Sequence, residues 1–349
     1  MSTVEIIRSF RDRMPWSVSH SVFSDLELGR RANWDKTLAH AETGDESYEE
    51  KTEDLLDALT EHLLCGEKLV RFYEVEKEKI KDFRRKAENL QVDDNIFSDK
   101  FPILVPENEL NGPVPNLSVS AIHKNEEGIA IVLSSKRYTY SRQKFLKDQF
   151  EDLPPELSKY NEFIGVSYKR YEAFDVLWIP NNSSVIEIRA DYPEGKEATQ
   201  VVYAINQAEI FFSKKFGEDY FQNKINFFPA IDSLYKSRDD GKVIELGFMV
   251  SGAAQKLEKS RRDGTCCRVE AYHLSGIQGL ELPIAVYRIV VMWKRPHNSN
   301  SYSRPEVGIH GRSTQTAEPS PYLTEIAISR CGSLEDYNFV RDRILRHCH

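Results

Sequence analysis

Apolar positions recur at helical spacing in the first hundred residues of the chain. Within EEKTEDLLDALTEHLL, residues 49–64, the apolar side chains fall on one side of a helix, and acids cluster near its start, where they suit the positive end of the helix dipole. A second pattern, from Leu69 to Leu90, places apolar residues at heptad-like steps of four and three, with Glu76 at one of these positions. The two patterns predict a helical hairpin. It either packs on the rest of the protein or forms a coiled-coil arm, so that residues 46–90 would bind a protein partner or a second copy.

The pattern changes after residue 95 and becomes typical of strands. FPILVPENELNGPVPNLSV, residues 101–119, is rich in proline and marks a boundary near residue 110. Beyond it, short runs of β-branched and aromatic residues predict strands at 117–124, 128–135, 163–171, 174–179, 184–191, 243–252, 265–274, 283–294 and 322–330. Two helices are expected among them, one ending at Gly217 and one capped by Ser333, and the polar residues 296–321 predict a long loop.

These elements predict an α+β fold. Residues 1–110 are expected to form an N-terminal helical hairpin unit, and residues 111–349 a mixed α/β body with a largely antiparallel sheet and packed helices. The chain has 349 residues, of which 40% are hydrophobic and 29% are charged, so a sizeable folded core is expected.

The composition of the chain predicts where the protein is located more clearly than what it does. No run approaches the roughly 18 apolar residues that cross a bilayer, so no membrane contact is expected. The N-terminal residues lack the apolar stretch of a signal peptide, and the five cysteines are sparse and odd in number, which together predict a cytoplasmic protein. A net charge of -8 makes the surface as a whole repel nucleic acid, although a local basic groove can still bind it.

The segment FDVLWIPNNSSVIEIRAD, residues 174–191, carries the most specific candidate chemistry. It predicts two antiparallel strands joined by a polar turn, in which alternation puts Glu187, Arg189 and Asp191 on one face of the second strand. If the strands pair, Asp175 comes alongside them. A two-metal nuclease needs convergent carboxylates of this kind to hold Mg²⁺ or Mn²⁺ beside the scissile phosphate.

The order of Asp, about a dozen residues and then Glu-x-Lys, followed by a helix, is that of the PD-(D/E)xK nuclease family, and residues 174–210 resemble it, with Arg189 at the lysine position. The resemblance implies Asp175 and Glu187 as metal ligands, with Arg189 or Lys196 holding the phosphate. Arginine stays protonated and cannot act as a base, although it can grip a phosphate. The alternative is a solvent-exposed ladder of charges on an ordinary strand.

A second candidate is the basic cluster in QKLEKSRRDGTCCR, in which Lys259 and Arg262 lie near one face if the segment is a helix that leads into a strand. DNA or RNA would contact its members, which are Lys256, Lys259, Arg261, Arg262 and Arg268. The alternative is an ordinary solvated surface. Because no catalytic motif is complete, the sequence favours a non-enzymatic binding or regulatory protein, an adaptor or sensor without a cofactor. A divergent metal-dependent nuclease is the other hypothesis.

Overall fold

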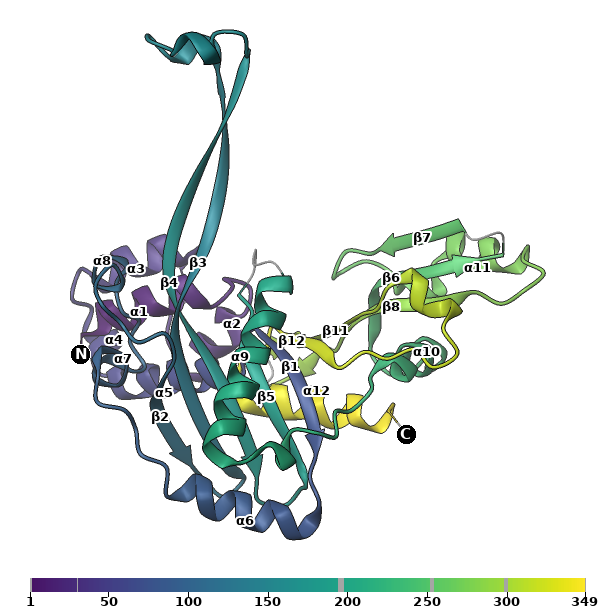
Figure 1. Cartoon of the computed structure of the whole chain (residues 1–349), viewed down its shortest axis with the longest axis horizontal. Coiled ribbons are helices and arrows are strands. Elements are labelled where there is room, and N and C mark those ends of the chain that lie inside the picture. The colour runs from purple at the N-terminus through teal and green to yellow at the C-terminus, as the bar shows by residue number, and fades with distance from the viewer. Residues whose placement is uncertain (1, 30, 194–197, 252–253, 298–300, 349) are drawn as a thin grey trace.

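The computed structural model describes residues 2–29, 31–193, 198–251, 254–297 and 301–348. Within these residues the fold is α+β, as the sequence predicts, and its centre is a ten-stranded sheet of order β2-β3-β4-β5-β1-β12-β11-β8-β6-β7 (Figure 1). Every neighbouring pair of strands in this sheet is antiparallel. The sheet strands are β1 (Lys68–Glu74), β2 (Ser118–Lys124), β3 (Gly128–Leu146), β4 (Glu162–Pro180), β5 (Val185–Asp191), β6 (Lys242–Val250), β7 (Ala254–Lys259), β8 (Ala285–Met292), β11 (Glu306–His310) and β12 (Glu325–Ser329).

Helices cover the sheet unevenly. We call strands β2, β3, β4, β5 and β1 the N-terminal half of the sheet, and β12, β11, β8, β6 and β7 its C-terminal half. On one face, the first face, α1 (Thr3–Arg13) and α5 (Thr52–Cys65) cover the N-terminal half, and α10 (Phe228–Lys236) and α12 (Leu334–Arg346) cover the C-terminal half. The second face carries α6 (Lys77–Glu88) and α9 (Ala198–Phe216), both on the N-terminal half. The other described α-helices and strands are α2 (Ser19–Asp25), α3 (Trp34–Ala41), α4 (Glu46–Glu49), α7 (Ile96–Lys100), α8 (Glu107–Leu110), α11 (Ala271–Gln278) and the short ribbon of β9 (Arg295–Pro296) and β10 (Tyr302–Ser303).

The N-terminal segment does not fold as a helical hairpin. Its predicted second helix is wrong in its first part, because Lys68–Glu74 form β1, which lies between β5 and β12 in the middle of the sheet. Leu69 and Tyr73 pack on one side of this strand, and Val70 and Phe72 on the other. A strand that is buried on both faces has a continuous apolar run, which periodicity cannot separate from a buried helix.

The apolar side of α5 packs inside the protein rather than outside it. Leu55, Leu59 and Leu63 are buried in the core formed with α1 and β4. Burial of these side chains removes about 1.5–3 kcal/mol each of unfavourable exposure. They are therefore not available as the partner-binding face that was expected within residues 46–90.

The predicted helix ends are confirmed, whereas one predicted strand and part of one predicted loop are wrong. The helix α9 ends at Gly217, whose φ of 114° favours glycine, and the Ser333 side chain caps α12, as predicted. The strand predicted over 265–274 is wrong: Glu270 caps α11 there by accepting from the backbone N–H of Tyr272 and His273. The loop predicted over 296–321 is also wrong in its middle, where β11 pairs with β8 and β12.

Two strands leave the sheet together and form a long arm. β3 and β4 are buried over residues 128–135 and 173–180, then continue as a two-stranded ribbon that projects from the body (Figure 1). We call residues 136–172 the arm, with a shaft of residues 136–146 and 162–172 and a tip of residues 147–161. The sequence predicted strands at both ends of β4, but gave no sign that they join into one.

Candidate nucleic-acid interface

The two carboxylates of the predicted nuclease site point to opposite faces of the sheet. In the register of β4 and β5, Glu187 lies opposite Trp178, and Ile188 lies opposite Leu177. Trp178 packs with α1 and α5 on the first face, whereas Leu177 packs with α9 on the second. Because side chains alternate along a strand, Asp175 shares the side of Leu177, and Glu187 the side of Trp178. The sheet itself separates the two carboxylates.

Each of these carboxylates is already held by protein groups. Arg137 pairs with Asp175, which also accepts a hydrogen bond from the backbone N–H of Asp191 at 2.9 Å. Glu187 accepts from Arg189 Nε at 2.8 Å and from the Tyr337 hydroxyl at 2.6 Å. Lys196 lies outside the described residues. Among the residues that the structure does describe, no group of three or more His, Cys, Asp and Glu side chains is placed to hold a metal ion.

The predicted acids also do not form an exposed ladder of charges. Glu187, Arg189 and Asp191 do share one face of β5, as expected, but all three are buried. The guanidinium of Arg189 lies over the rings of Trp178 and Tyr337, at 5.2 and 4.1 Å from their centroids. The strand is central in the sheet, and helices α5 and α12 cover the face that was expected to meet solvent.

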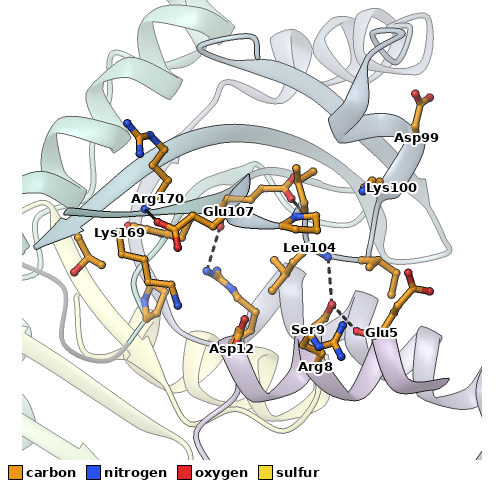
Figure 2. Close-up of a pocket in the computed structure, with 18 residues that line it drawn as sticks. Glu5, Arg8, Ser9, Asp12, Asp99, Lys100, Leu104, Glu107, Lys169 and Arg170 are labelled. Carbon is orange, nitrogen blue, oxygen red and sulfur yellow. Dashed lines mark hydrogen bonds between the residues drawn. The ribbon is translucent and has the colours of Figure 1, made fainter. Parts of the chain in front are cut away.

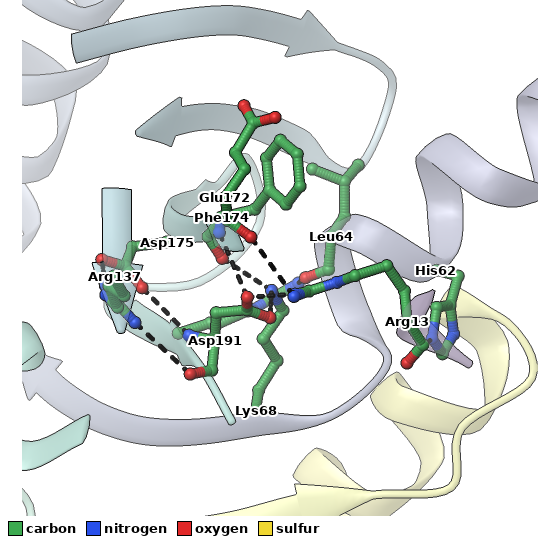
Figure 3. A network of polar contacts seen from close by, with 10 residues as sticks. Arg13, His62, Leu64, Lys68, Arg137, Glu172, Phe174, Asp175 and Asp191 are labelled. Atoms are coloured by element: carbon green, nitrogen blue, oxygen red, sulfur yellow. Dashed lines mark hydrogen bonds and ion pairs between the residues drawn. The ribbon is translucent and has the colours of Figure 1, made fainter. Parts of the chain in front are cut away.

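Asp191 is the centre of a buried polar network (Figure 3). Its carboxylate pairs with Arg13 from α1 and lies 3.4 Å from Nζ of Lys68, which also donates to the backbone oxygen of Phe174 at 2.8 Å. Burial by itself would raise the pKa of Asp191, but Arg13 and Lys68 outweigh it and hold that pKa below its ordinary value. Arg137 also donates to the Asp191 backbone oxygen, so the network ties α1, β1, β5 and the base of the arm together.

A hollow of about 570 Å³ lies beside this network, at the base of the arm (Figure 2). Glu172 accepts a hydrogen bond from the Val105 backbone N–H at 2.8 Å, and burial raises the pKa of Glu172 to about 7. The cations that line the hollow are matched by acids, so it offers no net attraction for a polyanion. The charged lining residues are Arg8, Arg13, Lys100, Lys169 and Arg170 against Glu5, Asp12, Asp99, Glu107 and Glu172.

The predicted basic cluster is divided between an edge strand, a turn and the core. Lys256 and Lys259 lie on β7, at the edge of the sheet, and not on the helix that was considered for this segment. Arg261 and Arg262 follow in the turn and are exposed. Arg268 is buried, and its guanidinium donates to backbone oxygens that include that of Leu234 at 2.9 Å. It therefore closes the end of α10 and is not available to a ligand.

Three hollows meet at Arg262, which lines all of them. One, of about 480 Å³, lies over the C-terminal half of the second face of the sheet, and strands and loops alone line it. The others, of about 750 and 290 Å³, lie beside β9 and β10. The basic residues that line the three hollows are Lys242, Lys259, Arg261, Arg262, Arg288, Lys294, Arg295, Arg304, Arg330 and Arg343, and we call this set the basic surface.

Much of the positive charge on this surface is matched within the protein. Glu245 pairs with Arg288 and Lys259, and Glu306 pairs with Arg262 and Arg330. In the same way, Arg295 pairs with Asp336, Arg343 pairs with Asp240, and Lys242 donates to backbone oxygens of the turn that contains Arg262. These contacts fix the shape of the hollows and reduce the charge that is left for a ligand.

Three cations of the basic surface have no such match. Within the part of the chain that the structure describes, no acidic side chain pairs with Arg261, Lys294 or Arg304. Nζ of Lys294 lies 4.4 Å from the centroid of the Tyr302 ring, and the guanidinium of Arg304 lies 5.0 Å from it. The Tyr302 ring is 38% exposed, so this stack offers an aromatic face and two positive charges to a ligand.

Sequence reasoning found Arg261 and Arg262 but missed Lys294, Tyr302 and Arg304. These three lie in and next to the segment that was expected to be a long loop, and the first of them comes 26 residues after Arg268, the last member of the basic cluster. The signal was present as a lysine and an arginine around a tyrosine in KRPHNSNSYSR. Only the pairing of β9 with β10 brings the two ends of that segment together.

No family model, no curated protein and no solved structure matches this chain.

Proposed function

We propose that this chain is a non-enzymatic, cytoplasmic nucleic-acid-binding protein, and that the basic surface contacts the phosphate backbone. The observation that carries the proposal is that Lys294 and Arg304 stack on the half-exposed ring of Tyr302 with no acidic partner among the described residues. Arg261, likewise without an acidic partner among them, lines an adjoining hollow. Cations that track a backbone, combined with an aromatic face on which a base stacks, are the usual elements of such sites.

The net charge and the cysteines of the protein also support the proposed function. The whole chain has a net charge of -8, so most of its surface repels a polyanion. A surface with unmatched cations attracts the polyanion and orients it toward itself. All five cysteines are free thiols, which supports the cytoplasmic assignment. None of the described helices has the length and apolar character needed to span a bilayer.

The geometry gives less support to the nuclease alternative. Asp175 and Glu187 would have to approach one metal ion from opposite faces of a sheet, and each is engaged by an arginine. Arg189 is buried beneath α12 and cannot reach a phosphate in solution. We therefore assign Asp175, Glu187 and Arg189 to the stability of the fold.

A charge-reversal variant tests the proposed function. Arg261→Glu, Lys294→Glu and Arg304→Glu are combined, and binding to labelled double-stranded DNA, single-stranded DNA and single-stranded RNA is measured by fluorescence anisotropy between about 50 and 200 mM salt. We expect the wild-type protein to bind with a salt-dependent affinity, and the triple variant to bind at least roughly tenfold more weakly. The slope of log affinity against log salt should also fall by about one for each lost phosphate contact.

The matched control is Lys36→Glu, Arg85→Glu and Lys236→Glu, which makes the same change in net charge at exposed positions away from the basic surface. If both triple variants lose affinity equally, net charge is responsible and the basic surface is not the site. If the wild-type protein binds none of the three nucleic acids, the proposed function is wrong.

A further inference from the structure

The arm has a charge pattern that differs from the rest of the chain. The shaft contains six basic residues, Lys136, Arg137, Arg142, Lys144, Lys169 and Arg170, against two acids at the ends of its second strand, Glu162 and Glu172. Arg137 pairs with Asp175 in the buried network, and Lys144 pairs with Glu162 at 2.5 Å. Lys169 and Arg170 line the hollow at the base of the arm. On a chain with a net charge of -8, the shaft therefore carries a local excess of positive charge.

The two faces of the shaft differ in what they expose. In the register of β3 and β4, Tyr138 lies opposite Arg170, Tyr140 opposite Tyr168, Arg142 opposite Val166, and Lys144 opposite Ile164. Opposite residues of an antiparallel pair point to the same side, so these eight side chains share one face, which we call the aromatic–basic face. Tyr168 is 67% exposed and Ile164 is 68% exposed, which is unusual for large apolar side chains.

Cations on this face are stacked on its tyrosines. The guanidinium of Arg142 lies 5.3 Å from the centroid of the Tyr140 ring, and that of Arg170 lies 5.4 Å from the centroid of the Tyr138 ring. Stacking orders these long side chains before any ligand arrives, and this lowers the entropy lost on binding.

The other face is small, polar and partly filled by the tip. Ser141 and Ser167 are hydrogen-bonded across the strands at 2.6 Å. Farther out, Phe150 from the tip packs on Phe145 and Phe163, with ring centroids 5.9 and 5.2 Å apart. Acids gather in the tip, which contains Asp148, Glu151, Asp152 and Glu156 against Lys147 and Lys159. A polyanion would therefore meet the aromatic–basic face of the shaft and avoid the tip.

The base of the arm is fixed rather than hinged. Arg137 pairs with Asp175 and also donates to the Asp191 backbone oxygen, and Asp191 is held by Arg13 and Lys68 (Figure 3). The residue that the sequence singled out as a metal ligand, Asp175, is in this structure the anchor of the arm. A rigid base lets the arm present its face in one orientation.

We infer that the arm binds double-helical DNA, with the aromatic–basic face of its shaft in the major groove. A shaft of residues 136–146 and 162–172 is about 36 Å long at roughly 3.3 Å per residue. This is about one turn of B-DNA, whose major groove, about 12 Å wide, admits a two-stranded β-ribbon. The major groove of A-form RNA is too narrow for side chains to read, so the fit favours DNA. This inference rests on the proposed function and names its substrate.

The test uses full-length protein with Arg142→Gln and Lys144→Gln on the aromatic–basic face. Lys147→Gln and Lys159→Gln in the tip form the charge-matched control on the same arm. Affinity for a 30-base-pair duplex is measured by anisotropy across the same salt range, and protection of guanine N7, a major-groove atom, from methylation is mapped on the bound duplex. Thermal unfolding of each variant is recorded beside the wild type, which shows whether the body of the protein is intact.

We expect the face variant to bind duplex DNA roughly tenfold more weakly, with a salt slope lower by about two, and the tip variant to bind like the wild type. Guanine N7 should be protected over about ten base pairs, and this protection should be lost in the face variant. A preference of the wild type for single-stranded nucleic acid or for RNA, or protection confined to adenine N3 in the minor groove, would overturn the inference.

The outcomes also separate this inference from the proposed function. If the triple variant of the basic surface loses affinity while the face variant binds as the wild type does, the arm is not a DNA contact and the proposed function stands. If the wild-type protein binds no nucleic acid, both fail. Loss of binding to vesicles of anionic phospholipid in the face variant, with no change for DNA, would assign the arm to a membrane surface and overturn the inference.

Discussion

Glu187 and Arg189 form an ion pair of 2.8 Å, and both side chains are only 1% exposed. They lie two residues apart on the same face of β5, beneath α12, where Tyr337 donates to the same carboxylate oxygen as Arg189. Both groups are shielded from water, so each charge compensates the other in the interior, and Arg341 also lies 3.7 Å from Glu187. The pair therefore belongs to the core of the protein, where its removal has a large and measurable cost.

Removing one partner of this pair should strongly destabilise the fold. We expect Glu187→Ala to lower the free energy of unfolding by about 3–5 kcal/mol, because it leaves the buried Arg189 guanidinium uncompensated. Urea unfolding at 25 °C measures the change. The double variant Glu187→Met, Arg189→Met should recover most of the loss, and Lys144→Ala in the exposed pair with Glu162 should cost less than about 1 kcal/mol. A cost for Glu187→Ala as small as that of Lys144→Ala would contradict this account.

Glu172 should make the stability of the protein fall as the pH rises toward neutral. Burial raises the pKa of Glu172 to about 7 from an ordinary 4.5, so between these values the folded state binds more protons than the unfolded state. Glu172→Gln keeps an acceptor for the Val105 N–H and does not titrate. The wild type should lose up to about 3 kcal/mol relative to this variant between pH 4.5 and pH 8. Urea midpoints at several pH values test this, and a difference that does not change with pH would refute it.

His62 should act in the opposite direction in an overlapping range of pH. Its ring is buried below Gly66, and burial lowers the pKa of His62 to about 4 from an ordinary 6.5. As the pH falls through this window, the unfolded state takes up a proton before the folded state does, and stability is lost. We expect the stability advantage of the wild type over His62→Gln to shrink by up to about 3 kcal/mol from pH 7 to pH 4.5. The same urea series measures it, with the Glu172→Gln protein as a control whose pH trend has the opposite sign.

Two glycines offer a matched pair of substitutions with opposite expected signs. Gly241 has a φ of 67°, and an added Cβ would lie 2.5 Å from Cγ1 of Val291, so Gly241→Ala should cost about 2–4 kcal/mol through strain and overpacking. Gly276 lies inside α11 with open space around it, so Gly276→Ala should stabilise the protein by up to about 1 kcal/mol. Thermal or urea unfolding of both variants decides the matter. A stabilising Gly241→Ala would show that the turn before β6 is looser than the structure has it.

Local patterns in the sequence determined a substantial part of the fold. The α+β class, the helix α5, the helix α9 with its end at Gly217, the Ser333 cap of α12 and the hairpin of β4 and β5 all follow from spacing, capping residues and turn formers. Such signals act between residues that are near one another in the chain, so they survive without knowledge of the tertiary structure. The exposed cations Arg261 and Arg262 were also found in this way.

Tertiary structure alone decided the rest. β1 resembles a helix in its apolar spacing, but it forms a strand because β5 and β12 pair with its backbone N–H and C=O groups. β11 is too short and too polar at its ends to be distinguished from a loop in the sequence. Whether Asp175 and Glu187 meet depends on which side of the sheet each side chain takes, and the register of β4 against β5 sets that. Arg262 lines one hollow together with Lys294 and Arg304, which lie far from it in the chain. Such long-range proximity produces no periodic pattern in the sequence.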